Sequence, residues 1–587
     1  MNGSGLLQAA LDAQLITLAD RHLARYVASL DDSVPEGLEL LVALASAQVR
    51  EGSVCLPLQD NPLLEELGVR VEPSELAASP LVGSPGQSAG KPLVLDGGRF
   101  YLARYHAWEQ QVIAAVRRLL AAPPPAFDEK LLRKGLDSGF PRHEEGVDWQ
   151  RVAAALALTR RFTVISGGPG TGKTWTVARI LELLLEQPWA AGMRIVLAAP
   201  TGKAAGRLTE SIGAANPALL EHTGKAQTLH RLLGMRPGRI DAAYGRDRPL
   251  PLDLLIVDEV SMVDLPMMAR LLAALPEQAQ LVLLGDRFQL ASVEAGQVMA
   301  DLCGDGEGSY SPETAVLLER LTGEPVPVSP GTLPPMADHL VILERSRRFD
   351  PERGIGRLAA AVKQGDGEAT FDVLQAGEDP VVWMPADTAS LQALLQERVI
   401  PLFRAIREAS SPQEALERLG ELRVLCAVRD GPQGVRLLNG LIERALGETR
   451  RDLYHGQPVM VTVNDYRQRL FNGDIGLVFR EEGGALRVWF PDGERGVRSL
   501  LPGRLPPHES IYAMTIHKSQ GSEFDEVILV LPEQESPLVT RELLYTGITR
   551  ARSRVTLCAS PSAIEKSVRQ RVRRVGGLYQ ALWQADG

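Results

Sequence analysis

One stretch of this chain fits a phosphate-binding pattern without a mismatch. Residues 167–174 read Gly-Gly-Pro-Gly-Thr-Gly-Lys-Thr, which matches G-x-x-x-x-G-K-[ST] at every position. The apolar run 162–165 precedes it, and apolar residues at helical spacing from Val177 to Leu184 follow it. Glycines let the backbone wrap an anion, so that successive N–H groups point at the phosphates. The flanking strand and helix argue against a Gly-rich turn that fits by chance, and predict a site for a nucleoside triphosphate.

The side chains of this loop have separate expected roles. Lys173 is expected to reach the β- and γ-phosphates, and the Thr174 hydroxyl to hold Mg²⁺. The residues expected to bind the nucleotide are Gly167, Gly168, Pro169, Gly170, Thr171, Gly172, Lys173 and Thr174. The predicted cofactors are therefore ATP and Mg²⁺.

Composition limits what else the chain can be. With 587 residues it is too long for one core, and roughly three or four domains are expected. The net charge of −10 means that any nucleic-acid site must be a local patch. The four cysteines contain no CxxC pair, which argues against a zinc site or a disulfide framework. No apolar run reaches the ~20 residues of a membrane span, and no signal-peptide layout opens the chain. A cytoplasmic location without a membrane contact is expected.

From about residue 148, strands alternate with helices, which predicts an α/β fold with a parallel sheet. Four apolar strands each run into a polar cluster, and ligands of such sheets bind at the carboxyl ends of the strands. These strands lie at 162–165, 195–197, 254–257 and 281–284. The clusters after the second, third and fourth strands begin at Pro200, Asp258 and Gly285.

Changes in composition divide the chain further. Residues 1–120 look mostly helical, and the proline run at 123–125 opens a linker over 121–147. A first α/β domain is expected at 148–335 and a second at 336–587. Within the second domain, short alternating runs and tight turns at about 456–508 predict a small inserted antiparallel barrel.

Phosphoryl transfer also needs carboxylates and cations around the phosphates. Asp258, at the tip of a buried strand, is suited to hold Mg²⁺, and Glu259 is suited to orient the attacking water. Gln289 is a candidate sensor of the γ-phosphate. Arg348 and Arg550 are candidate arginine fingers if the nucleotide lies between two α/β domains, although spacing alone leaves surface salt bridges equally open.

Several further segments occur in a characteristic order. They are 167–174, 199–205, 257–262, 285–290, 515–521 and 549–551, joined by 152–161, 208–211, 228–234 and 290–296. This set resembles the superfamily 1 helicases and, more narrowly, the RecD family of α subunits of the bacterial RecBCD enzyme (exodeoxyribonuclease V). The resemblance covers nearly the whole chain and is weakest over residues 1–120.

The resemblance implies two RecA-like P-loop motor domains, a helical N-terminal docking domain and an inserted SH3-like β-barrel. It implies that Gln150 reads the adenine, and that Lys173, Glu259, Gln289, Arg348 and Arg550 catalyse hydrolysis. Single-stranded DNA is expected to contact Thr201, Gly202, Lys203, Thr228, His230, Asn464, Thr515, His517, Lys518 and Ser519.

The function that the resemblance implies is an ATP-dependent DNA helicase that moves 5′ to 3′ in double-strand-break repair and homologous recombination. RecB-type and RecC-type subunits and DNA ends are the expected partners. No nuclease cluster is apparent in the sequence, so nuclease activity is expected in a partner subunit. A free-standing superfamily 1 helicase and a structural subunit with a vestigial ATP site are the alternatives.

Five features depart from the family pattern or leave a choice open. Trp175 stands where a small residue or threonine is usual, and Arg347 where tyrosine is frequent. His106 replaces a common tryptophan. The segment 232–251 is short where relatives carry a strand-separating hairpin. The arginines at 569–574 are interpreted as a solvated helix face, with a nucleic-acid or partner contact as the alternative.

Overall fold

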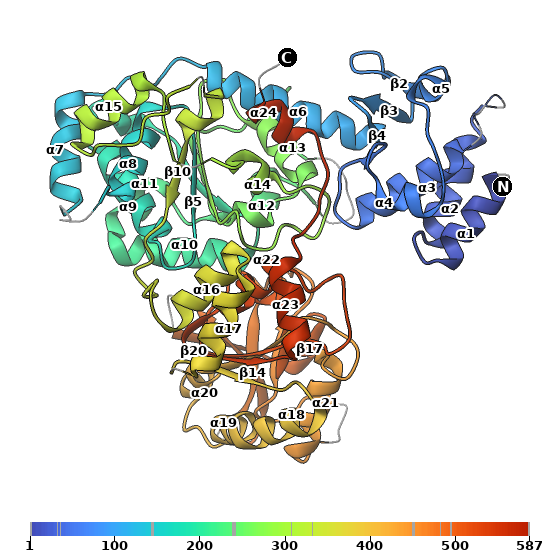
Figure 1. The fold of residues 1–587 in the computed structure, drawn as a ribbon. Helices are drawn as coiled ribbons and strands as arrows, with labels where there is room; N and C mark the ends of the chain where they lie inside the picture. The colour runs from blue at the N-terminus through green and yellow to red at the C-terminus, as the bar shows by residue number, and fades with distance from the viewer. Residues whose placement is uncertain are drawn as a thin grey trace.

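Two parallel sheets carry the α/β pattern of the chain (Figure 1). The structure, a computed structural model, describes residues 3–31, 33, 35, 37–141, 146–236, 242–306, 308–331, 333–377, 379–448, 452–465, 467–481, 483–492 and 496–584.

The first sheet has six strands, in the order β10-β5-β9-β8-β6-β7. All are parallel, and their bounds are β5 Phe162–Gly167, β6 Ile195–Ala199, β7 Gln227–Thr228, β8 Leu254–Val257, β9 Gln280–Gly285 and β10 Leu340–Leu343. The four strands predicted from the sequence are thus β5, β6, β8 and β9. Because β10 pairs with β5, the first sheet extends past the expected domain boundary at residue 335.

Successive residues of these strands point to opposite faces, and each face has its own core. Val164 and Leu283 belong to one core, which also holds side chains of α6, α13 and α14. Ile165 and Leu284 belong to the other, which holds side chains of α7, α8, α9 and α15. The helices of this domain are α7 Glu129–Gly139, α8 Trp149–Thr159, α9 Lys173–Leu185, α10 Gly202–Ala215, α11 Pro217–Thr223, α12 Leu229–Leu232, α13 Leu265–Ala274, α14 Val298–Cys303 and α15 Pro312–Thr322.

The second sheet has five parallel strands, in the order β11-β20-β19-β12-β18. The strands are β11 Val381–Met384, β12 Leu422–Cys426, β18 Ala513–Thr515, β19 Phe524–Val530 and β20 Ala551–Cys558. The helices around it are α16 Gly354–Gln364, α17 Gly367–Ala376, α18 Thr388–Leu394, α19 Ile400–Arg407, α20 Pro412–Arg418, α21 Val435–Ala445, α22 Arg541–Ile548 and α23 Pro561–Arg569.

An antiparallel sheet is inserted before β18, where the sequence predicts a small barrel. Its order is β16-β15-β14-β13-β17, with β13 Pro458–Val461, β14 Ile475–Arg480, β15 Leu486–Asp492, β16 Gly496–Leu500 and β17 His508–Ser510. It has a small apolar core of its own that includes Val459, Val478 and Phe490.

The N-terminal block, for which the sequence of residues 1–120 predicts mostly helices, also contains a small sheet. Five helices, α1 Gly3–Asp12, α2 Leu18–Ala28, α3 Leu38–Arg50, α4 Pro62–Glu66 and α5 Pro73–Ala77, accompany a sheet of order β1-β4-β3-β2. The strands are β1 Leu56–Pro57, β2 Val82–Gly83, β3 Leu93–Asp96 and β4 Arg99–Leu102. The following α6, Ala103–Ala121, packs with α13 into the first sheet's core. Likewise α7, inside the expected linker, buries Leu132 and Leu136 in that domain.

The end of the chain returns to the first domain. After α23 the chain crosses from the second domain to α24, Leu578–Trp583, which lies against α6 and α14 (Figure 1, red). On the way, Arg574 donates to the carbonyls of Ser292 (2.6 Å), Glu294 (3.0 Å) and Gly296 (2.7 Å). Since α23 ends at Arg569, Arg574 does not lie on a solvated helix face; it ties this C-terminal arm (residues 570–584) to the first domain.

None of the helices in the described part of the chain is long and apolar enough to cross a membrane.

The Arg574 contacts predict a specific loss of stability. Arg574→Ala is expected to lower the free energy of unfolding of the first domain by about 2 kcal/mol, because three carbonyls lose a charged donor. Urea denaturation followed by tryptophan fluorescence measures this. Arg573→Ala, which removes an exposed neighbouring arginine, is the matched control, and equal midpoints for both variants would contradict the prediction.

Candidate active site

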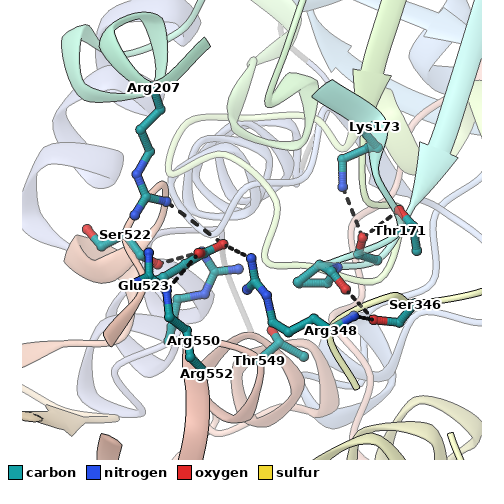
Figure 2. A network of polar contacts seen from close by, with 12 residues as sticks. Thr171, Lys173, Arg207, Ser346, Arg348, Ser522, Glu523, Thr549, Arg550 and Arg552 are labelled. Carbon is teal, nitrogen blue, oxygen red and sulfur yellow. Dashed lines mark hydrogen bonds and ion pairs between the residues drawn. The ribbon is translucent and has the colours of Figure 1, made fainter. Parts of the chain in front are cut away.

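The phosphate loop lies between β5 and α9, as predicted. Gly170 and Gly172 have φ values of 78° and 81°, which favour glycine, and Gly172 precedes the first residue of α9. No side chain caps this helix start, so its first N–H groups are available to an anion. The Lys173 ammonium donates to the carbonyls of Gly167 (2.6 Å) and Gly168 (3.2 Å) and is thereby folded onto the loop (Figure 2).

Two carboxylates follow β8 at the same edge of the sheet. Burial, and then the neighbouring Glu259 carboxylate, raise the pKa of Asp258 to about 6, although the Lys173 ammonium opposes the shift. Glu259 adopts a left-handed backbone with φ 55°, which costs a non-glycine residue about 1–3 kcal/mol. Its N–H donates to Asp258 Oδ1 at 2.8 Å. Backbone strain of this kind gathers at functional sites.

These groups line a cleft between the two sheet domains. It encloses about 610 Å³, within the roughly 300–1,000 Å³ of small-ligand sites. The first domain contributes the loop, both carboxylates and Gln289. The other side is lined by the connection from β10 to α16, the segment between β18 and β19, and the junction of α22 with β20. These contribute Arg347, Arg348, Glu523, Arg550 and Arg552. Thr174 and Asp258, the expected Mg²⁺ ligands, both face this space.

Glu523 gathers the arginines on the second side of the cleft (Figure 2). Its carboxylate accepts from Arg348 Nη2 at 2.7 Å, and lies 3.4 Å from Arg552 Nε and 3.9 Å from Arg207 Nη1 of the first domain. Burial raises the pKa of Glu523, but the Arg348 and Arg207 guanidinium groups outweigh burial and hold that pKa below its usual value.

The two expected arginine fingers differ in how many of their N–H donors are already hydrogen-bonded within the protein. Arg550 is buried and donates to the carbonyls of Thr546 and Ser522, both at 3.2 Å. Arg348 Nη1 is buried and has no hydrogen-bond partner in the described part of the chain. This spare donor, the uncapped start of α9 and the glycine-lined loop together fit a polyphosphate.

Gln289 takes part in a network of hydrogen bonds that joins the two domains. Asp286, at the end of β9, accepts from Gln289 Nε2 and from the Tyr545 hydroxyl of α22, both at 3.1 Å. Next to it, Leu290 N–H donates to Thr546 Oγ1 at 3.0 Å, and Gln520 Nε2 donates to the Leu290 carbonyl at 3.0 Å. The sequence carries no local signal for a role of the Tyr545 hydroxyl, because its partner Asp286 lies 259 residues earlier.

Gln150 also lies beside the loop, where it was expected. Its Nε2 donates to the Thr171 carbonyl at 2.8 Å and its Oε1 accepts from Arg347 Nη2 at 2.7 Å. The guanidinium of Arg347 lies over the Trp175 ring, 5.0 Å from its centroid. The two departures from the family pattern near the loop therefore contact each other.

The residues expected to contact DNA lie mostly beyond the carboxyl ends of strands. Thr201 follows β6 and caps α10, Thr228 ends β7 and caps α12, and His230 is exposed on α12. Thr515 ends β18, and the exposed Lys518 forms an ion pair with Glu509. His517 is partly buried, and Asn464 is exposed in the loop after β13.

Three of the positions expected to contact DNA already make close contacts within the protein. The Ser519 side chain is fully buried and its hydroxyl donates to the Ile516 carbonyl at 2.7 Å, so the expected DNA contact does not fit this conformation. Gly202 leaves room for Phe471, whose ring would lie 2.6 Å from a Cβ at that position. Lys203 Nζ donates to Ser522 Oγ across the domain interface at 2.5 Å. Burial, then Arg207 and Arg423, lower the pKa of Lys203 to about 7.

No group of three or more His, Cys, Asp or Glu side chains is arranged to hold a metal ion within the residues that the structure describes.

Three family models match successive parts of the chain. A model of the AAA domain matches residues 150–295, and a UvrD-like helicase C-terminal domain matches residues 510–558. The N-terminal domain of RecBCD enzyme subunit RecD matches residues 12–73. The first two models cover the two sides of the cleft, and the third covers most of the N-terminal block.

Curated relatives extend over nearly the full length. RecBCD enzyme subunit RecD of Mycolicibacterium smegmatis is 41% identical, covering 97% of this chain and 98% of the relative. The same subunit of Haemophilus influenzae is 37% identical, over 84% and 81%. The ATP-dependent RecD2 DNA helicase of Deinococcus radiodurans is 31% identical, over 86% of this chain and 60% of that protein.

Among solved structures, Bacteroides Pif1 bound to single-stranded DNA is similar at 18% identity and a TM-score of 0.39, covering 72% of this chain and 94% of that one. This similarity adds nothing to the family assignment. The full-length relatives, and the three models in their order along one P-loop chain, show that the protein belongs to the RecD family of RecBCD enzyme subunits, helicases of the UvrD-like type.

Proposed function

We propose that this chain hydrolyses ATP with Mg²⁺ in the cleft and uses the cycle to move along single-stranded DNA in the 5′-to-3′ direction. One observation carries the proposal: a complete phosphate loop and two carboxylates face arginines of a second α/β domain across one cleft. Nucleotide binding between two domains links hydrolysis to their relative motion. The direction follows only from the family resemblance.

Each group has a chemical task in hydrolysis. Thr174 and Asp258 would hold Mg²⁺, which neutralises charge on the phosphates when bound. Lys173 exchanges its loop carbonyls for the β- and γ-phosphates. Glu259 orients the attacking water, and Arg348 and Arg550 stabilise the charge that develops on the γ-phosphate.

Glu523 is placed to compete with the nucleotide for one arginine. Its carboxylate accepts from Arg348, and a phosphate brought into the cleft would compete for the same guanidinium. Asp286, hydrogen-bonded to both Gln289 and Tyr545, passes the state of the cleft to α22.

The DNA path that we propose crosses the carboxyl ends of both sheets, over the clusters around Thr201, Thr228 and Thr515. Hydroxyl, amide and lysine donors there suit phosphates without reading the bases. Asn464 and the exposed Lys518 extend the path over the inserted sheet, which we propose to be an SH3-like barrel because it carries its own apolar core.

Relatives named as RecBCD subunits support assembly with RecB-type and RecC-type partners at DNA ends in the cytoplasm, in double-strand-break repair and recombination. The N-terminal block would then dock on a partner, and the nuclease would reside in a partner subunit. A free-standing helicase and a structural subunit with a vestigial ATP site are the competing functions. Among the described residues, the buried Arg348 Nη1 has no hydrogen-bond partner, and the Glu259 backbone is strained. Both observations favour an active site over a vestigial one.

Removing the loop lysine tests hydrolysis. Lys173→Gln is expected to lower ATP turnover in the presence of single-stranded DNA by about 10²-fold or more, because the phosphates lose their cation. Phosphate release by the purified chain, alone and with partner subunits, measures this. Lys130→Gln on the exposed face of α7 is the control, and a Lys173→Gln variant with at least about a tenth of the wild-type rate would contradict the proposal.

Lys203 gives DNA binding a pH dependence. Because the pKa of Lys203 is lowered to about 7, its charge is present below that pH and is lost as pH rises through it. Lys203→Met should therefore weaken binding of an oligo-dT strand more at about pH 6 than at about pH 8.5.

Fluorescence anisotropy at constant salt gives the ratio of variant Kd to wild-type Kd at each pH. A ratio about threefold larger at the lower pH is expected, and equal ratios at the two pH values would exclude Lys203 as a titrating DNA contact.

A further inference from the structure

The C-terminal arm crosses from the second domain to the first within a few residues (Figure 1, red). The second domain holds the start of the arm. The Arg541 N–H donates to the Gln570 carbonyl at 2.8 Å, and the Val572 N–H donates to Glu542 Oε2 at 2.9 Å. Arg541 and Glu542 are the first two residues of α22, the helix whose Tyr545 takes part in the contact between the domains. The arm therefore leaves the second domain from a helix that also lies at the cleft.

The first domain and the N-terminal block hold the next residues of the arm. The Arg574 guanidinium donates to three carbonyls of the first domain. The Val54 N–H of the N-terminal block donates to the Val575 carbonyl at 2.7 Å. The block is joined to the first domain at the same place, since the Gly296 N–H donates to the Gly52 carbonyl at 2.9 Å. The arm, the block and the first domain thus meet at one point.

Farther along, the arm is buried between the N-terminal block and the first domain. Glu109 of α6 is buried, and its two oxygens accept from the Gly577 N–H at 2.7 Å and from the Tyr101 hydroxyl of β4 at 2.9 Å. Leu578 and Leu582 of α24 belong to the apolar core that also holds side chains of α6 and α13. These contacts fix the end of the arm on the first domain.

The length of the crossing limits the separation of the two domains. Val572 is held by the second domain through its N–H, and Val575 is held by the N-terminal block through its carbonyl. The three residue steps between them span at most about 11 Å when fully extended. A larger separation of the domains at this edge must break one of these hydrogen bonds.

We propose that the C-terminal arm is a strap that limits how far the two sheet domains separate at this edge of the cleft, and that the N-terminal block holds the strap in place. The inference rests on the nucleotide cycle proposed above. None of the described residues that line the cleft belongs to the N-terminal block, so the block acts on nucleotide release through the arm. Because a lost hydrogen bond changes an equilibrium constant by about fivefold, loosening the strap favours the open cleft by about that factor.

Two substitutions loosen the strap from opposite ends. Glu542→Ala removes the acceptor for the arm in the second domain. Gly52→Ala acts in the N-terminal block, because Gly52 has a φ of 96° and a Cβ there would lie 2.5 Å from the guanidinium carbon of Arg574, which must move. Gly37→Ala is the matched control, since Gly37 has a φ of 91° in the same block and open space at its Cβ position. Glu533→Ala, at an exposed position of the second domain, is the control for Glu542→Ala.

The measurement uses two dyes on the full chain, one on each side of the strap. All four native cysteines are buried, so cysteines introduced at the exposed Gln111 of α6 and Glu565 of α23 take the dyes selectively. Single-molecule energy transfer without nucleotide reports the separation of the domains, and the release of a fluorescent ADP analogue reports the cleft. Both strap variants should raise the ratio of open to closed molecules about fivefold and speed ADP release about threefold or more, while both controls stay within about twofold of wild type.

Open-to-closed ratios of both strap variants within about twofold of their controls would overturn the inference. A change caused by Glu542→Ala but not by Gly52→Ala would overturn the role of the N-terminal block. If circular dichroism shows that Gly52→Ala unfolds the block, Ser53→Ala takes its place, because Ser53 Oγ accepts from the Val575 N–H at 3.3 Å. A wild-type chain that binds no ADP would overturn the proposed function, and the energy transfer, which needs no nucleotide, would still decide whether the strap limits the separation.

Discussion

The relation between the two domains depends on one buried carboxylate, that of Asp286. It ends β9 of the first sheet, accepts from Gln289 beside the cleft and from Tyr545 of the second domain, and takes the Phe288 N–H on its other oxygen. A buried polar group that loses a hydrogen-bond partner costs about 1–3 kcal/mol. Breaking any one of the hydrogen bonds to Asp286 would therefore destabilise this contact. Together with the hydrogen bonds Leu290–Thr546, Gln520–Leu290 and Lys203–Ser522, this contact keeps the loop facing the arginines across the cleft.

Three residues of the cleft carry a local energetic cost or a donor held only within the protein. The backbone of Glu259 is strained, and within the described residues Arg348 Nη1 has no hydrogen-bond partner and Lys173 donates to carbonyls of its own loop. In the same cleft, the Glu523 carboxylate pairs with arginines from both domains, among them Nη2 of Arg348. A bound polyphosphate with its metal would accept hydrogen bonds from Arg348 and Lys173 and lie beside Glu259. The residues with a local energetic cost are therefore the ones that the proposed hydrolysis uses.

Local sequence predicted the parts of this site but not their connections. Strands β5, β6, β8 and β9 are continuous apolar runs that end in polar clusters, so both the sheet and its functional edge were readable. The boundary at residue 335 was wrong because β10 joins the first sheet after a long insertion. Pairing between residues 176 positions apart, such as Leu340 and Val164, leaves no local pattern. Arg574 was assigned to a helix face for a similar reason: its partners lie some 280 residues earlier. Trp175 and Arg347 were each noticed as departures, and only the structure brings them together.

We propose that nucleotide and DNA communicate through the contact between Asp286 and Tyr545. Tyr545→Phe removes a single hydroxyl and keeps the ring packed in the core of the second domain. The direct measurement is ATP hydrolysis by this variant with and without single-stranded DNA. We predict that DNA-free turnover stays within about twofold of wild type while the stimulation by DNA falls about fivefold or more, a coupling loss of about 1 kcal/mol. Stimulation equal to that of the wild-type chain would contradict the account.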